Sequence, residues 1–444
     1  MDYQDNKSSK SRSENCVFDR LSPLPDDVLH RILSFVDFLD VVRTCVLSRR
    51  WRNVWMSVQC LNFDMNWFEE RNEFWDSIMW FLLLRDESEI RRIKLTFDHS
   101  MIVQLNAFLC FAARKKVQEL CLHVVDYTNK DLNFPSELCE TLKSLTLKFR
   151  ENISLRVAKS FSSLKSLFLS GVFISSDAAE KLFSGCVELE DLHLEDVNVK
   201  DVEIISISAD KLKNLTISNM YRDGNFLLVS SFHCKLNIRA PNLVSFSYFG
   251  PMLCGFAFLD TVSLRHLSIR ILYINQQDQV RWGRENISPL ASKFVGLNHA
   301  KNLTLSSLVV KYFSPTHFDP LGVTFILDNL NYLKLGLRCK VDYIEGLINL
   351  LKLSPNVETL AIRFPEVNVG FHLVVQNEFF SLNPNVHYDY FISGSLVFST
   401  TTIKYNRYLI LLSFFSILIL KELPGSSSLS YFISLLVLKI KITH

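Results

Sequence analysis

One hydrophobic frame, L-x-x-L-x-L, recurs along most of the chain. Alternating apolar and polar positions within a frame predict a short strand whose fourth and sixth residues point inward. Successive copies are 21 to 36 residues apart, mostly within or near the range of about 20 to 29 residues that is typical of leucine-rich repeats. The copies open at Ile90, Val117, Leu142, Leu164, Leu189, Leu212, Leu243, Leu264, Ala300, Leu330 and Val357. This spacing predicts a solenoid in which the frames stack into one curved parallel sheet.

The segments between frames are predicted to form the convex side. Residues 176–183 favour a short helix, with Asp177 as its N-cap and Gly185 after its end. Other linkers are predicted to be irregular or extended. Pro241-Asn242 and Pro355-Asn356 each precede a frame, where a proline can bend the chain into the strand without losing a ladder bond.

The third, fifth and seventh frame positions are predicted to face outward on the concave side and to form a recognition surface. Phe168 and Tyr332 are expected to be exposed aromatics there, although any single position could also be an ordinary solvated strand residue. Asp191, His193 and Glu195 lack a fourth metal ligand of known position, so we expect neither a metal nor a cofactor. The candidate residues are Arg92, Lys94, Thr96, Phe168, Asp191, His193, Glu195, His266, Arg270 and Tyr332.

A different pattern precedes the repeats. Leu24-Pro25-Asp26-Asp27 predicts a helix start, because proline and acidic residues suit the first turn. An apolar stripe runs from there to about Val36, and Asp40 and Ser48 are predicted N-caps of two further short helices. The last of these carries Trp51 and Trp55 on one face. About 40 residues with this much apolar surface indicate a partner, or else a small helical cap on the repeats.

Composition narrows the function classes. The 444 residues are 48% hydrophobic and 21% charged with a net charge of +2, so the chain should fold, and a nucleic-acid partner is not expected. The phosphate-binding, nucleophile-elbow and zinc-protease motifs are absent from the sequence, which favours a non-enzyme. Ten scattered cysteines and a polar start without an apolar leader favour the nucleus or cytoplasm. Residues 1–18 are expected to be disordered.

The N-terminal pattern resembles a plant F-box. The resemblance rests on residues 19–35, with the helix start and Ile32-Leu33-Ser34-Phe35, and on residues 42–55, with Val46-Leu47-Ser48-Arg49-Arg50-Trp51 and a terminal Trp55. Residues 37–40 depart from the Pro-Thr-Lys type turn that is usual in relatives. The resemblance implies a non-catalytic subunit whose helices dock on a Skp-type adaptor linked to a cullin, and whose repeats present a protein substrate for ubiquitination. The residues implied for the adaptor interface or its support are Leu24, Pro25, Leu29, Ile32, Leu33, Val42, Leu47 and Trp51.

The repeats are in turn similar to those of plant F-box/leucine-rich-repeat proteins, through residues 240–250 and 350–360. The second segment resembles the opening of the FBD region that closes many of these proteins. The predicted organisation is a disordered lead at 1–18, an F-box at 19–60, a solenoid at 61–364 with an FBD-like start near 340–364, and an atypical tail at 365–444. The fold class is α/β.

The further strands and helix that are expected of an FBD region are not recognisable in the sequence of the tail. An apolar run at 408–420 is shorter than the approximately 18 to 20 residues needed to span a bilayer, so a membrane role is not expected. A membrane anchor, a buried end-cap and a misread coding sequence remain alternatives for this segment. For the whole chain, the alternatives to a ubiquitin-ligase subunit are a repeat scaffold with a non-functional F-box, a truncated gene product, and a co-receptor for a small ligand.

Overall fold

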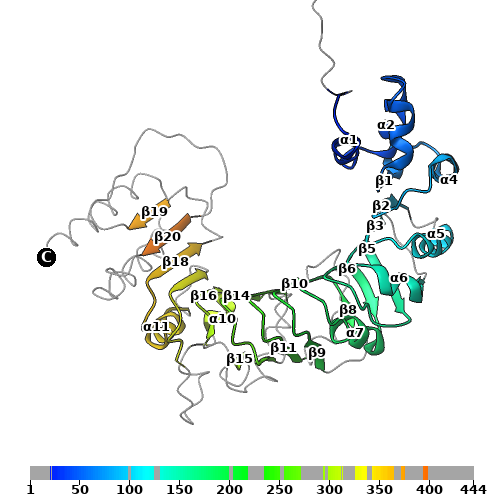
Figure 1. The fold of residues 1–444 in the computed structure, drawn as a ribbon. Helices are drawn as coiled ribbons and strands as arrows, with labels where there is room; N and C mark the ends of the chain where they lie inside the picture. The colour runs from blue at the N-terminus through cyan, green and yellow to red at the C-terminus, as the bar shows by residue number, and fades with distance from the viewer. Residues whose placement is uncertain are drawn as a thin grey trace, which may run out of the picture.

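The fold is an arc, with a helical module at the N-terminal end and one long curved sheet along the concave side (Figure 1). The structure of the protein is a computed structural model. The structure describes residues 21, 23–98, 102–124, 131–199, 204–218, 235–250, 255–271, 294–295, 299–311, 313, 326–337, 343–364, 372–375 and 394–398. The predicted lead at 1–18 and the apolar run at 408–420 lie outside these residues. Among the described helices, none is long and apolar enough to cross a membrane.

The concave sheet confirms the predicted repeat frame. Each of the frames forms a strand that begins two residues after the frame opens, and neighbouring strands pair in parallel. Inward residues such as Ile93 and Leu95 are fully buried. The strands are β2 (Arg92–Phe97), β3 (Glu119–Val124), β5 (Ser144–Val157), β6 (Ser166–Ile174), β7 (Asp191–Glu195), β10 (Asn214–Ser218), β12 (Ser245–Gly250), β14 (His266–Ile271), β16 (Asn302–Ser306), β17 (Tyr332–Gly336) and β18 (Thr359–Phe364).

The sheet also continues beyond the predicted frames at both ends. Strand β1 (Cys60–Asp64) pairs with β2, and Val58, Leu61 and Phe63 repeat the frame spacing in a copy that the sequence analysis missed. At the other end, β20 (Gly394–Phe398) pairs antiparallel with β18, and β19 (His372–Val375) pairs with β20. These two strands lie in the predicted tail, where the sequence analysis recognised no strand pattern.

Helices and a second sheet cover the back of the concave sheet (Figure 1). The helices are α4 (Arg71–Leu84), α5 (Ile102–Arg114), α6 (Ser136–Thr141), α7 (Ser176–Phe183), α10 (Ser307–Lys311) and α11 (Ile344–Leu353). In the middle of the array the linkers form a parallel sheet of β15 (Phe294–Val295), β13 (Gly255–Leu259), β11 (Lys235–Arg239) and β9 (Ile204–Ser208). Two short strands, β4 (Asp131–Phe134) and β8 (Asn198–Val199), pair with β5 and β6.

The cap of α7 differs from the prediction. The Ser175 hydroxyl accepts a hydrogen bond from the Ala178 amide at 3.2 Å, whereas the Asp177 carboxylate pairs with Lys181 at 2.8 Å. Serine and aspartate are both good N-caps, so sequence alone cannot separate two candidates that stand two positions apart.

The two Pro-Asn pairs share a structural role. The Asn242 amide nitrogen donates to the Asp210 carbonyl, and the Asn356 amide nitrogen donates to the Asp328 carbonyl, each at 2.8 Å. In both cases the acceptor lies just before the preceding frame. Asparagine at this place therefore ties each repeat to its neighbour at the edge where the strands begin.

The N-terminal module is the described part of residues 19–60, and it consists of short helices that stack on the β1 end of the sheet. They are α1 (Asp26–Leu33), α2 (Phe38–Arg43), η1 (Thr44–Val46), α3 (Trp51–Val54) and η2 (Trp55–Ser57), and η3 (Met65–Trp67) follows β1. Helix α1 ends at Leu33, so the predicted apolar stripe, which runs to about Val36, extends beyond the helix. Trp51 and Trp55 are both buried, as their shared face predicted.

The cap of α2 was also assigned to the wrong residue. The Asp37 carboxylate accepts a hydrogen bond from the Leu39 amide at 3.0 Å, whereas the predicted cap, Asp40, lies inside the helix and pairs with Arg43 at 2.8 Å. The Ser48 hydroxyl does accept from the Trp51 amide ahead of α3, at 3.5 Å.

Candidate functional site

The first helix begins at the predicted motif. Pro25 is the N-cap, and its carbonyl accepts hydrogen bonds from the amides of Val28 and Leu29, each at 3.1 Å. Proline fixes a backbone angle suited to a helix start, and the acidic residues Asp26 and Asp27 occupy the first turn, where the helix dipole favours negative charge.

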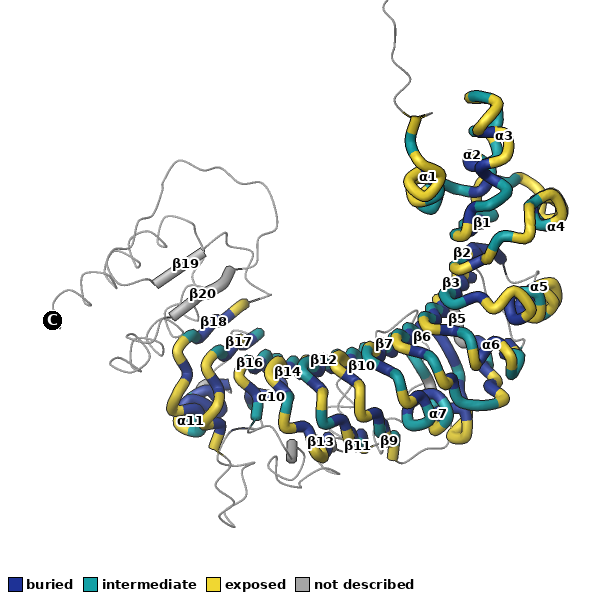
Figure 2. Tube along the Cα trace, in the orientation of Figure 1, coloured by how far each residue is buried: buried dark blue, intermediate teal, exposed yellow. Residues whose placement is uncertain are grey.

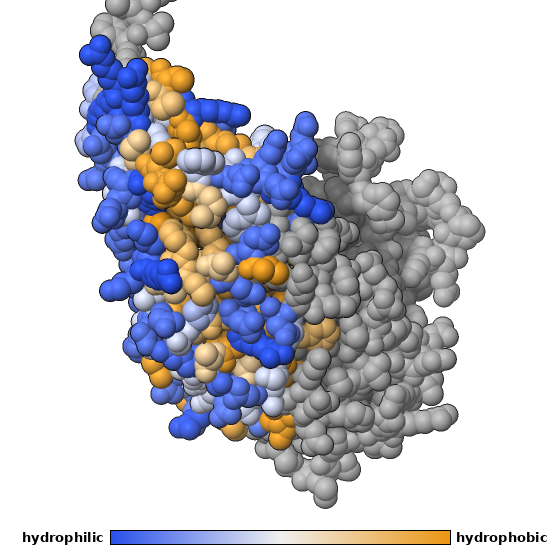
Figure 3. All heavy atoms as spheres, turned by 90° about the vertical axis from the view of Figure 1, so that its right-hand side faces the viewer, coloured by the Kyte–Doolittle hydropathy of each residue, from blue (hydrophilic) through white to orange (hydrophobic). Residues whose placement is uncertain are grey.

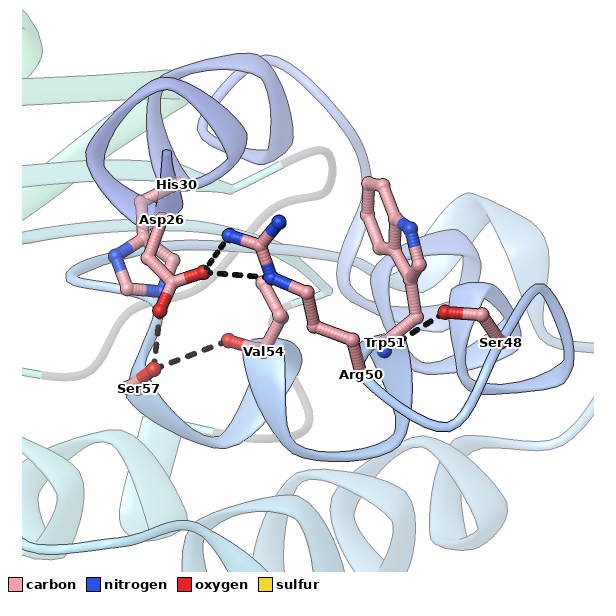
Figure 4. Close-up of polar contacts among 7 residues, drawn as sticks. All are labelled: Asp26, His30, Ser48, Arg50, Trp51, Val54 and Ser57. Atoms are coloured by element: carbon pink, nitrogen blue, oxygen red, sulfur yellow. Dashed lines mark hydrogen bonds and ion pairs between the residues drawn. The ribbon is translucent and has the colours of Figure 1, made fainter. Parts of the chain in front are cut away.

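Polar contacts then lock α1 against α3 and η2 (Figure 4). Arg50 pairs with the Asp26 carboxylate, with its Nε at 3.1 Å. His30 Nε2 lies 2.9 Å from the Ser57 hydroxyl, which in turn donates to the Val54 carbonyl at 3.2 Å. Arg50 therefore has a structural role in positioning α1.

The predicted adaptor-binding residues separate into an inner and an outer group. Leu29, Leu33 and Trp51 are 0%, 2% and 3% exposed, so they belong to the core of the module and can act only as support for a surface. Leu24 and Val42 are half-buried and pack against this core. The outer group is Pro25, Ile32 and Leu47, which are exposed.

The structure adds residues to this outer group. Val28, Ile32 and Phe35 are 41%, 40% and 79% exposed, and their spacing places Val28 and Ile32 on one side of α1 with Phe35 just beyond its end. Val46 and Leu47, between α2 and α3, are 83% and 59% exposed. We call these five residues the outer apolar set. Figure 2 shows α1 largely exposed. Val28 was already in the predicted stripe, and Phe35 and Val46 stood in the recognised motif, but sequence alone did not show which side of the stripe faces outward.

An aromatic cluster joins the module to the sheet. The Phe38 ring, at the start of α2, lies 4.8 Å from that of Phe63 on β1 and 5.8 Å from that of Phe81 on α4, measured between centroids. Phe81 also contacts Trp55 at 5.4 Å. Arg92 of β2 reaches back to donate to the Ser34 carbonyl at 3.4 Å. The module and the first repeats therefore share one core.

The same junction contains a carboxyl group, that of Asp37, which is unfavourable to ionise. The pKa of Asp37 is raised to about 6, mainly by burial and to a smaller degree by the nearby carboxylates of Asp64 and Asp40. The hydrogen bond from the Leu39 amide acts in the opposite direction but does not offset the burial. Ionised Asp37 is therefore a source of instability at neutral pH.

Exposed apolar residues also occur behind the sheet, next to the module. Met79, Trp80 and Leu83 on the outward side of α4 are 60%, 63% and 71% exposed. Figure 3, which views this side, shows apolar residues gathered in a band flanked by hydrophilic ones.

The predicted concave surface is only partly exposed. Lys94, Asp191, His266 and Arg270 are exposed, while Arg92, His193 and Glu195 are half-buried. Three predictions need correction: Thr96 is buried at 3%, and Phe168 and Tyr332 are half-buried, because neighbouring strands lie close enough for their side chains to cover one another.

Phe168 illustrates this covering. Its ring stacks on the His193 ring at a centroid distance of 4.4 Å and an interplanar angle of 15°, and Lys148 Nζ lies 4.9 Å from its centroid. Burial lowers the pKa of His193, with Glu195 raising it and Lys148 lowering it. Asp191 accepts instead from the Asn214 amide nitrogen at 2.7 Å. The described residues hold no group of side chains suited to a metal ion.

Comparisons with known proteins agree with this geometry. A family profile described as the F-box domain matches residues 21–63, and a profile for the LRR repeats of the FBD-associated F-box protein At5g56370 matches residues 105–263. These two ranges hold the helical module and the middle of the concave sheet.

Relatives in Arabidopsis thaliana match longer stretches. The F-box/LRR-repeat protein At3g26922 is 34% identical over 205 residues, which cover 45% of this chain and 67% of the relative. The F-box/LRR-repeat protein At4g14096 is 28% identical over 361 residues, 77% of this chain and 72% of the relative. The F-box/FBD/LRR-repeat protein At5g53840 is 26% identical over 359 residues, 80% of this chain and 76% of the relative. The repeat frames, the helical module and these matches together show that the chain belongs to the F-box/LRR-repeat protein family.

Proposed function

We propose that this chain is the substrate-recognition subunit of a cullin-based ubiquitin ligase. In this proposal the F-box binds a Skp-type adaptor, which links it to a cullin, and the repeats hold a protein substrate. The chain itself carries out no chemistry, and it acts in the nucleus or cytoplasm.

The observation that carries the proposal is the outer apolar set. A module of about 40 residues with its own core would ordinarily turn such side chains inward, yet Phe35, Val46 and Leu47 are more than half exposed. Beneath them, Leu29, Leu33 and Trp51 are buried, and Arg50 pairs with Asp26 of α1, so this surface has a packed support. Exposed apolar side chains on a packed support can act as anchors in a protein interface.

The shared core supports a mechanical part of the proposal. Because Phe38, Phe63 and Phe81 join the F-box to the first repeats, an adaptor bound at the F-box would hold the concave sheet at a fixed orientation. A ligase subunit needs a fixed orientation of its repeats, because ubiquitin is transferred to a lysine that the bound substrate presents. The rigid junction therefore suits a subunit that positions its substrate.

A pull-down tests the proposal. The full chain is incubated with a purified Skp-type adaptor beside the double variant Ile32→Ala/Phe35→Ala. The control is Met79→Ala/Leu83→Ala, which removes two other exposed apolar side chains, from α4. We expect binding by the wild type and the control and loss of binding by the F-box variant. A folded wild-type chain that retains no adaptor would contradict the proposal and leave a repeat scaffold.

A further inference from the structure

The N-terminal part of the concave face carries two lysines and a histidine on neighbouring strands. Lys94 is the fifth frame residue of β2, and His123 and Lys148 are the seventh frame residues of β3 and β5. His123 and Lys148 are direct partners in the strand register. All three side chains are exposed on this face. Adjacent strands are about 4.8 Å apart, so the three groups lie within one small patch. We call Lys94, His123 and Lys148 the cationic patch.

The charges of this patch are not neutralised within the described part of the chain. Neither Lys94 nor Lys148 has a carboxylate within ion-pair distance there. The carboxylate of the nearby Glu119 lies 3.6 Å from Arg91 Nε and 3.9 Å from Arg92 Nη1, so it pairs with these arginines.

The effect of these charges is visible at His123. Partial burial lowers the pKa of His123, and the positive charges of Lys148 and Lys94 lower it further, while Asp64 opposes them. At this point of the face the two lysines therefore outweigh Asp64. An incoming anion would relieve this repulsion.

One member of the patch is held in place before any ligand arrives. Lys148 Nζ lies over the ring of Phe168, whose position is fixed by stacking on His193. A cation over an aromatic face is stabilised by the ring quadrupole and loses less side-chain freedom on binding. A similar pair lies farther along the sheet, where the guanidinium of Arg270 is 4.7 Å from the Phe249 ring centroid.

The outward fifth and seventh positions are mostly cationic, hydroxyl-bearing or small. Acidic residues at these positions of the concave strands are Asp64 and Glu195, and the cationic residues besides the patch are Arg270, Lys334 and Arg363. Serine and threonine fill much of the face between them, as at Thr216, Ser218, Ser247, Ser268 and Thr304. Short hydroxyl side chains leave room for a peptide and can donate hydrogen bonds to it.

From this arrangement we propose that the cationic patch binds an acidic segment of the substrate protein, with Lys94 and Lys148 pairing with its anionic side chains. The proposal rests on the proposed function, because it names the substrate class for that role. The binding face is the concave sheet near the F-box. This places the acidic segment close to the adaptor side of the ligase.

Fluorescence anisotropy on the full chain in complex with a Skp-type adaptor tests the proposal. The probes are labelled 12-residue peptides with alternating Glu and Gly, the same peptide with Gln for Glu, and the same peptide with phosphoserine for Glu. We expect the Glu peptide to bind more tightly than the Gln peptide and to weaken as salt rises. Tighter binding of the phosphoserine peptide would assign the acidic groups to phosphorylation, and equal or weaker binding would assign them to carboxylates.

The variant Lys94→Glu/Lys148→Glu should weaken Glu-peptide binding by about tenfold or more, because like charges then face each other. The control Lys301→Glu/Lys334→Glu changes the net charge equally at the far end of the array, and should stay within about twofold. Equal binding of the Glu and Gln peptides, or an equal loss in both variants, would overturn the proposal. The adaptor pull-down is repeated with the same proteins. If the proposed ligase-subunit function is wrong, the wild-type chain fails to bind adaptor, and this result is distinct from a loss of peptide binding.

Discussion

Phe35 and Phe38 are three residues apart and should respond oppositely to the same substitution. Phe38 is 3% exposed and contacts the rings of Phe63, Phe68 and Phe81, whereas Phe35 is 79% exposed. Replacing a buried phenylalanine by alanine removes its transfer free energy and leaves a cavity, at a cost of about 3–5 kcal/mol. Replacing the exposed one should change the free energy of unfolding by about 0.5 kcal/mol or less.

The adaptor affinity should show the reverse order. Truncating an exposed aromatic anchor at an interface centre costs about 2 kcal/mol, which is about a 30-fold increase in Kd. Phe35→Ala should therefore bind adaptor weakly while remaining folded. For Phe38→Ala, the fraction of protein that binds adaptor should equal the fraction whose F-box is folded.

Hydrogen exchange read by mass spectrometry on the full chain measures the local free energy of opening for peptides from α2 and β1, and titration calorimetry measures the adaptor Kd. The F-box and the first repeats share a core, so Phe38→Ala should raise exchange in both peptides. If Phe35→Ala raised exchange as much as Phe38→Ala, or bound adaptor as tightly as the wild type, the assignment of outer and inner residues would be refuted.

Three further outcomes can be measured. Asp37→Asn keeps an acceptor at the α2 N-cap and removes an ionised group whose pKa is raised in the folded state. It should therefore raise the free energy of unfolding of the F-box by about 1 kcal/mol at pH 7.5. Urea unfolding at several pH values should show this gain shrinking as the pH falls through about 6. Burial raises the pKa of the Cys139 thiol to about 11, so at pH 8 a thiol reagent should label exposed Cys110 first and Cys139 only after denaturation. Gly171→Ala should lower the thermal midpoint by the equivalent of more than about 1 kcal/mol, because φ is +66° there and the new Cβ would collide with the Phe149 carbonyl oxygen.

The repeat strands could be predicted because the apolar positions of each frame determine which of its residues face the core. A frame such as Leu142 to Leu147 buries its first, fourth and sixth residues, and a shift of one residue would turn them to solvent. Strand β1 obeys the same rule, but its frame opens at Val58, inside the predicted F-box, and was not counted among the frames. Strands β19 and β20 escaped because β20 pairs antiparallel, outside the repeat.

The candidate site was less predictable from sequence. The stripe on α1 has two sides, and only the packing of α3 decides that Leu29 and Leu33 face inward while Val28 and Ile32 face outward. N-cap assignments failed where two suitable residues stood close together, as at Asp37 and Asp40. On the concave face, Phe168 is covered by residues of the adjacent repeats, which are 20 or more positions away in sequence.

The central claim is that the outer apolar set binds a Skp-type adaptor. The most direct measurement is the Kd of the full chain for purified adaptor, by titration calorimetry, compared with Ile32→Asp and with Leu83→Asp on α4 as the control. We predict that Ile32→Asp weakens binding by about 30-fold or more, since it places a charge in an apolar interface, and that Leu83→Asp leaves the Kd unchanged. Equal Kd values for the wild type and Ile32→Asp would contradict the account.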